Sequence, residues 1–191
     1  MLYVNQLEHP DMPYQHNMAR GGAPEERRNV ATSGCGLCCA CMIVDGLTDK
    51  SLPLEECVRL SEDNAANLCL GTNMTVLGPI LAEKFDLEYS TTENLEEAIA
   101  HLQNGGQIIC LVGHPEGQPG LFTMRSHYIT LVSTDGKEFC ILDPSYKEGK
   151  FDIPERVGKV DCSRYPYLYC DVNTVHAETT EEKYYMFKRK R

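Results

Sequence analysis

Apolar residues in the first half of the chain recur at helical spacing, whereas those in the second half form short, strand-like runs. The apolar segment 35–45 ends at Gly46 and predicts a buried helix, because glycine is a common helix terminator. The same spacing predicts helices over 75–85 and 95–102. Another helix is expected after Ser51, with Pro53 in its first turn and acidic residues near its positive end. The first half of the chain is therefore expected to be mainly helical.

Beyond Gly105 the pattern changes to runs rich in β-branched and aromatic residues. These runs predict strands over 107–112, 127–133, 137–143 and 184–188, the second and third joined through Asp135-Gly136. Helices first and strands second predict an α+β fold in one domain. That domain covers 1–191, with a helical N-terminal lobe over 1–105 and an antiparallel β lobe over 106–191.

The charge balance and the hydropathy exclude several classes of function. The formal net charge is −10, and phosphate binding needs clustered Lys and Arg, so no nucleic-acid partner is expected. No run of about 18 apolar residues is present, so no membrane span is expected. The first ten residues lack the basic and apolar segments of a secretory signal, which favours the cytoplasm unless a signal has been removed.

The chain has ten cysteines, four of which fall within the seven residues 35–41. A chain of this length needs no disulfides to fold, so most are expected to be buried free thiols in a reducing compartment. Cys35, Cys38, Cys39 and Cys41 also invite a zinc site. They lie on one predicted helix, however, whereas structural zinc sites use two spaced pairs on turns. We therefore expect neither a metal nor a cofactor.

Cys35 stands between two glycines at the start of the predicted buried helix. A thiol there lies at the positive end of the helix dipole, which favours the nucleophilic thiolate. The flanking glycines would let a substrate carbonyl approach closely. The alternative is an inert thiol in a Gly-Cys-Gly turn.

A thiolate nucleophile needs a base that a third group orients. His127 opens one strand of the predicted hairpin and Asp143 closes the other. A three-residue loop with Gly136 left-handed would pair Ser133 with Lys137 and place His127 opposite Asp143, with Cβ atoms roughly 5 Å apart. Alternatively, His127 is a structural histidine and Asp143 simply initiates a turn.

Three segments together resemble a known family. They are Ser-Gly-Cys-Gly at 33–36, His-Tyr-Ile-Thr-Leu at 127–131 and Ile-Leu-Asp-Pro at 141–144. They resemble the papain-like cysteine peptidases of the bacteriocin-processing type, also called cysteine peptidase family thirty-nine. The resemblance implies a papain-like fold, a Cys35-His127-Asp143 triad and an early strand whose Gln6 completes the oxyanion hole. Leu37 departs from the family's usual proline.

The resemblance implies a cysteine peptidase or amide hydrolase that acts on a peptide or protein substrate through an acyl-enzyme. Acyl transfer to an amine or thiol would use the same triad, and a non-catalytic peptide-binding module would keep the same fold. Gln15 is a second candidate for the oxyanion donor, and His114 is a second candidate for the base.

Overall fold

The computed structural model describes residues 1–15, 28–67, 71–114 and 119–190. The segment 8–28, whose Pro, Gly and charged residues predict a long surface loop, lies mostly outside the described residues. The helices are η1 (Gln6–Glu8), α1 (Val30–Ser33), α2 (Cys35–Leu47), α3 (Leu54–Asp63), α4 (Met74–Phe85), α5 (Leu95–Gln103) and α6 (Val172–Ala177). The strands are β1 (Leu87–Thr92), β2 (Gln107–Val112), β3 (His127–Thr134), β4 (Glu138–Leu142), β5 (Val160–Arg164), β6 (Tyr167–Asp171) and β7 (Thr179–Arg189).

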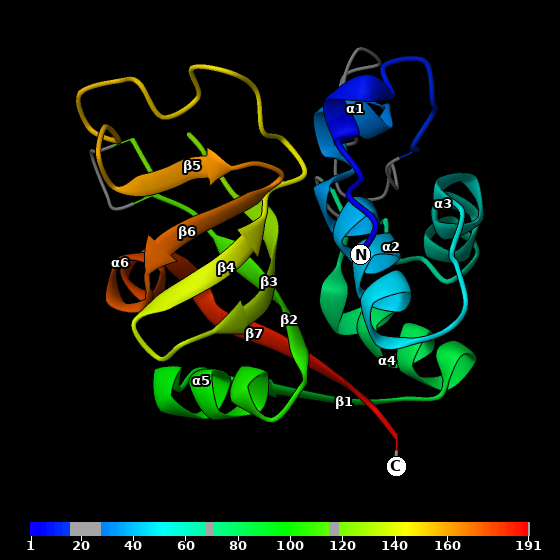
Figure 1. Ribbon diagram of the computed structural model, residues 1–191. Coiled ribbons are helices and arrows are strands. Elements are labelled where there is room, and N and C mark those ends of the chain that lie inside the picture. The colour runs from blue at the N-terminus through cyan, green and yellow to red at the C-terminus, as the bar shows by residue number, and fades with distance from the viewer. Residues whose placement is uncertain (16–27, 68–70, 115–118, 191) are drawn as a thin grey trace.

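The strands form one seven-stranded sheet in the order β1-β7-β2-β3-β4-β6-β5, in which all neighbours are antiparallel. The long strand β7 lies between β1 and β2, so the C-terminal segment joins the first strand to the rest of the sheet (Figure 1). The described part of the chain is thus a mixed helix and strand structure.

Both faces of the sheet are covered. In Figure 1, α1 to α4 gather on one side of the sheet, and α5 and α6 lie on its other side. Strand β2 is buried along its whole length, which explains the uninterrupted apolar run 108–112 within it. Its residues Ile109 and Leu111 pack into the same cluster as α2, whereas Ile108 and Cys110 pack with α5 and α6.

Helix α2 carries the start of the expected site and is almost wholly buried. It does not stop at Gly46 as expected but continues to Leu47, with Thr48 as its C-cap. A Cβ atom on residue 46 would lie 2.5 Å from Oε1 of Gln107 in β2. Gly46 therefore serves the close contact between α2 and the sheet and does not terminate the helix.

The expected order of helices followed by strands needs correction at 87–103. Strand β1 precedes α5 and pairs with β7, and α5 packs on the face of the sheet away from α2. Strands β5 and β6 and helix α6 were also not predicted. Among the described residues, no helix is long and apolar enough to cross a membrane.

Candidate active site

Cys35 is the first residue of α2, with Gly34 as the N-cap. The first residue of a helix has a main-chain N–H without an acceptor in that helix, so this N–H can face a ligand. Gly36 follows, and a Cβ atom there would lie 2.7 Å from Cβ of Thr72. This close approach holds the start of α2, and with it the partly exposed Cys35 thiol, in place.

His127 is the first residue of β3, and Asp143 directly follows the end of β4. The Nε2 atom of His127 lies 2.8 Å from Oδ1 of Asp143, and both side chains are buried. A second hydrogen bond joins the imidazole to the Cys35 thiol. Because Nε2 faces the carboxylate, Nδ1 is the ring nitrogen left for the thiol. The structure thus brings the three residues of the expected triad together.

The hairpin that brings His127 to Asp143 differs from the expected one. Ser133 pairs with Cys140 and not with Lys137, so the predicted register is wrong. Gly136 has the predicted left-handed backbone, with φ of 90°. The turn is longer than predicted because the Asp135 carboxylate accepts hydrogen bonds from two successive main-chain N–H groups, those of Lys137 and Glu138.

The predicted register placed His127 and Asp143 on the same face of the sheet. A bulge at Val132 places them on one face although that register is wrong. Leu131 pairs with Ile141 on one side of Val132, and the register on the other side differs by one residue. A shift of one residue moves a side chain to the opposite face of a sheet. Without the bulge, His127 and Asp143 would therefore lie on opposite faces.

The surroundings of Cys35 and His127 favour a thiolate beside an imidazolium. Burial works against ionisation of Cys35, but the hydrogen bond and charge of His127 outweigh it and lower the thiol pKa. Burial likewise opposes the charge on His127, but its hydrogen bonds to Asp143 and Cys35 raise the imidazole pKa. In contrast, burial raises the pKa of Cys38 and of Cys39.

Two residues that the sequence did not single out complete the surroundings of Asp143. The Ser145 hydroxyl lies 3.0 Å from Nε2 of His127, and the Ser145 N–H donates to Oδ1 of Asp143 at 2.9 Å. Lys150 pairs with Oδ2 of Asp143. Asp143 therefore initiates a turn and also binds the histidine, so both readings of this residue hold. No local sequence signal marks Lys150.

Gln6 lies close to the same site, in η1 and not in the expected strand. Its main-chain N–H donates to the carbonyl of Pro144 at 2.7 Å, which fixes it beside the Asp143 turn. Its Nε2 donates to the carbonyl of Ala31 at 2.7 Å, and its Oε1 is buried without a partner. An amide nitrogen carries two N–H groups, so one remains for a ligand.

A cavity of about 460 Å³ opens beside the thiol. Its lining combines polar and apolar surface from η1, α1, α2, β3 and the segments 123–126 and 143–145: Gln6, Thr32, Ser33, Cys35, Thr123, Met124, Arg125, Ser126, His127 and Ser145. None of the described residues that line the cavity has a carboxylate side chain, although the whole chain has a net charge of −10. A neutral peptide backbone could enter it without electrostatic repulsion.

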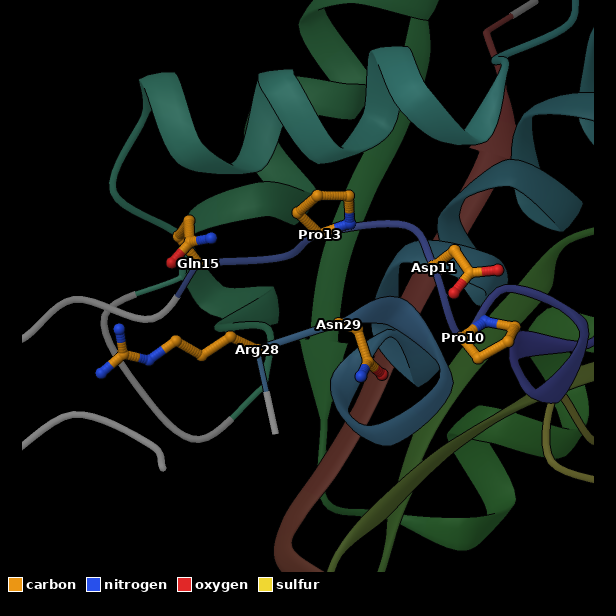
Figure 2. Close-up of a pocket in the computed structure, with 6 residues that line it drawn as sticks. All are labelled: Pro10, Asp11, Pro13, Gln15, Arg28 and Asn29. Atoms are coloured by element: carbon orange, nitrogen blue, oxygen red, sulfur yellow. The ribbon is translucent and has the colours of Figure 1, made fainter. Parts of the chain in front are cut away.

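The alternative candidates Gln15 and His114 do not line this cavity. Gln15 lines a separate hollow with Pro10, Asp11, Pro13, Arg28 and Asn29, and its N–H donates to Glu62. Figure 2 shows Gln15 beside Arg28 at one end of this hollow. The exposed His114 follows β2 and lies outside both hollows.

The remaining cysteines give no sign of a second site. Nine of the ten lie in the described residues, and all nine are free thiols. Seven of them are buried, and only Cys35 and Cys162 are partly exposed. No group of three or more metal-ligating side chains occurs within residues 1–15, 28–67, 71–114 and 119–190.

Comparison with known proteins reveals distant structural similarity. No family model matches the chain, and no curated protein matches its sequence. The solved structure of UfSP from C. elegans matches with a TM-score of 0.42 and 17% identity. The match covers 98% of this chain and 34% of that one, so this chain spans about a third of UfSP. Because so low a TM-score defines no shared function, the activity has to be inferred from the residues themselves.

Proposed function

We propose that this protein is a cysteine peptidase or amide hydrolase that cleaves a peptide or peptide-like substrate. Cys35 is the nucleophile, His127 is the general base and acid, and Asp143 orients the histidine. The observation that carries the proposal is the position of the His127 ring, which is hydrogen-bonded to the Cys35 thiol and, through Nε2 at 2.8 Å, to Asp143. A nucleophile, a base and an orienting group in this order define the logic of a catalytic triad.

In the first step the Cys35 thiolate attacks the scissile carbonyl carbon, and the carbonyl oxygen becomes negatively charged. The main-chain N–H of Cys35 and the free N–H of Gln6 Nε2 are the donors to this oxygen. The intermediate collapses to a thioester as the C–N bond breaks, and His127 gives its proton to the leaving amine. Water then attacks the thioester and His127 takes its proton. The C–S bond breaks, which releases the acid product and regenerates the Cys35 thiolate beside the protonated His127.

The pKa directions support this division of roles. A lowered Cys35 pKa and a raised His127 pKa both favour the ionised thiol and the protonated imidazole. The protonated imidazole is the form that the leaving amine requires. The resemblance of the three motifs to bacteriocin-processing peptidases supports the same assignment on independent grounds.

A peptide-library digest read by mass spectrometry tests the proposal. The parent protein should cleave a defined subset of peptides, and Cys35→Ala should cleave none. Cys162→Ala is the matched control, because Cys162 is the other partly exposed thiol among the described cysteines and does not line the cavity. Equal cleavage by the parent and Cys35→Ala would contradict the proposal.

Adding a competing amine to the same digest separates hydrolysis from acyl transfer. Both reactions pass through the thioester, so the catalytic residues are the same and only the acceptor differs. Free carboxylate products support hydrolysis. Amide products formed from the added amine would mean that the enzyme is an acyltransferase. Cleavage of no peptide, with substrates that nevertheless bind, would support a binding module.

A further inference from the structure

The two oxygens of the Asp143 carboxylate have different partners. Oδ1 accepts from Nε2 of His127 at 2.8 Å and from the main-chain N–H of Ser145 at 2.9 Å. Oδ2 accepts from the ammonium group of Lys150. The side chains of this Lys-Asp pair are only 6% and 0% exposed, so the pair is shielded from water. A triad of cysteine, histidine and aspartate does not by itself call for a buried lysine.

Several hydrogen bonds hold Lys150 in this place. Its Nζ also donates to the Ser145 hydroxyl at 2.8 Å, and that hydroxyl lies 3.2 Å from Oδ1 of Asp143. The carbonyl of Lys150 accepts from Nη1 of Arg156 at 3.1 Å. Nε of Arg156 donates in turn to the carbonyl of Gly120 at 2.9 Å. The buried guanidinium thus fixes the backbone that carries the lysine.

The opposite charges of Lys150 and Asp143 are so close together that their electric fields largely cancel at the nearby His127 ring. Without Lys150, a buried carboxylate 2.8 Å from the imidazole would stabilise the imidazolium strongly. An imidazolium that is too stable gives up its proton poorly, which would slow protonation of the leaving amine. With Lys150 present, the carboxylate still accepts the hydrogen bond that fixes the ring, but its net field at the ring is smaller.

We propose that Lys150 is a positioning residue that balances the charge of Asp143, so that Asp143 orients His127 without over-stabilising the imidazolium. The catalytic consequence of this inference rests on the proposed function. The charge balance itself is a property of the site with or without substrate. Lys150 acts through Asp143 and does not line the cavity beside Cys35.

The charged groups that act on this pair are few and come from several elements. Lys150 interacts with Asp143, Arg156 and Cys35, and burial lowers its pKa. Burial disfavours the Asp143 carboxylate, but Lys150 and His127 together hold its pKa well below the usual range. His127 in turn interacts with Asp143 and Cys35. Replacing Lys150 removes the positive charge beside Oδ2 of Asp143, whereas the imidazolium of His127 beside Oδ1 remains.

The test compares Lys150→Met, Lys150→Arg and the exposed control Lys147→Met by the pH dependence of Cys35 alkylation. Alkylation needs no substrate, so it tests the charge balance even if the protein is not a peptidase. The alkylation rate should change where His127 loses its proton, and in Lys150→Met this change should occur at a pH about one unit higher than in the parent. This pH should stay near the parent value in Lys150→Arg and in Lys147→Met. The parent value in folded Lys150→Met would overturn the inference.

A double variant keeps the inference testable if Lys150→Met folds poorly. Asp143→Asn keeps an oxygen for the Nε2 hydrogen bond but leaves Lys150 buried and unpaired, whereas Asp143→Asn with Lys150→Met leaves no unpaired charge. The double variant should therefore melt higher than Asp143→Asn, and Cys35 should be alkylated about tenfold faster. A double variant that is no better than Asp143→Asn in either respect would overturn the charge-balance account. If the parent protein cleaves no peptide, that result refutes only the proposed function and not the charge balance.

Discussion

The Nε2 atom of His127 lies 2.8 Å from Oδ1 of Asp143, although the strands that carry the two residues change register between them. The change occurs at Val132 of β3, which has no paired residue in β4. That single residue returns His127 to the face of the sheet on which Asp143 lies. The geometry on which the proposed activity depends is thus set by an irregularity in the hairpin, not by regular pairing.

The first prediction is a bell-shaped dependence of kcat/KM on pH. The Cys35 pKa is lowered, so the thiolate persists below the ordinary range of a thiol, and activity should rise as the pH passes up through this lowered value. The His127 pKa is raised, so the imidazolium persists above its ordinary range, and activity should fall as the pH passes up through that value. A profile that rises steadily to the ordinary thiol pKa would contradict the ion pair.

The second prediction concerns the oxyanion. Replacing Gln6 with Ala should reduce kcat about a hundredfold, or about 3 kcal/mol, because one preorganised donor is lost. Alkylation of Cys35 should be unchanged, because the thiol and its histidine remain. Gln15→Ala is the matched control and should turn over like the parent, since Gln15 lines a different hollow. Full activity in Gln6→Ala would remove this residue from the mechanism.

Local signals in the sequence predicted much of the candidate site. A cysteine between glycines before an apolar run predicted the start of α2, and the predicted strand 107–112 coincides with β2. These features depend on neighbours along the chain, so a sequence pattern can reveal them. The three motifs of the resemblance supplied the pairing of residues that lie far apart.

The remaining features depend on contacts between distant segments. The bulge at Val132 and the Lys150–Asp143 pair have no periodic signature. Strand β1 was missed because four of its six residues are at least partly exposed and its strand character comes from pairing with β7. The sequence predicts a helix stop at Gly46, because the contact of this residue with Gln107 is visible only in three dimensions.

The third prediction tests that contact. Gly46→Ala alone should destabilise the protein by about 1–3 kcal/mol, because the new Cβ atom would lie 2.5 Å from Oε1 of Gln107. In a Gln107→Ala background the same substitution should instead stabilise by up to about 1 kcal/mol, since alanine is the better helix former. Urea unfolding of the parent, the two single variants and the double variant measures both changes in the free energy of unfolding. A loss of equal size in both backgrounds would mean that Gln107 is not the obstacle.

The most direct test of the central claim is competitive alkylation of the native protein with a haloacetamide at about pH 6, mapped over all ten cysteines by mass spectrometry. The account predicts that Cys35 is modified first, because its thiolate persists beside the imidazolium, and that His127→Ala abolishes this preference. Cys162, partly exposed but with a raised pKa, is the internal reference. Faster modification of Cys162, or an undiminished preference for Cys35 in His127→Ala, would contradict the assignment of Cys35 and His127 as nucleophile and base.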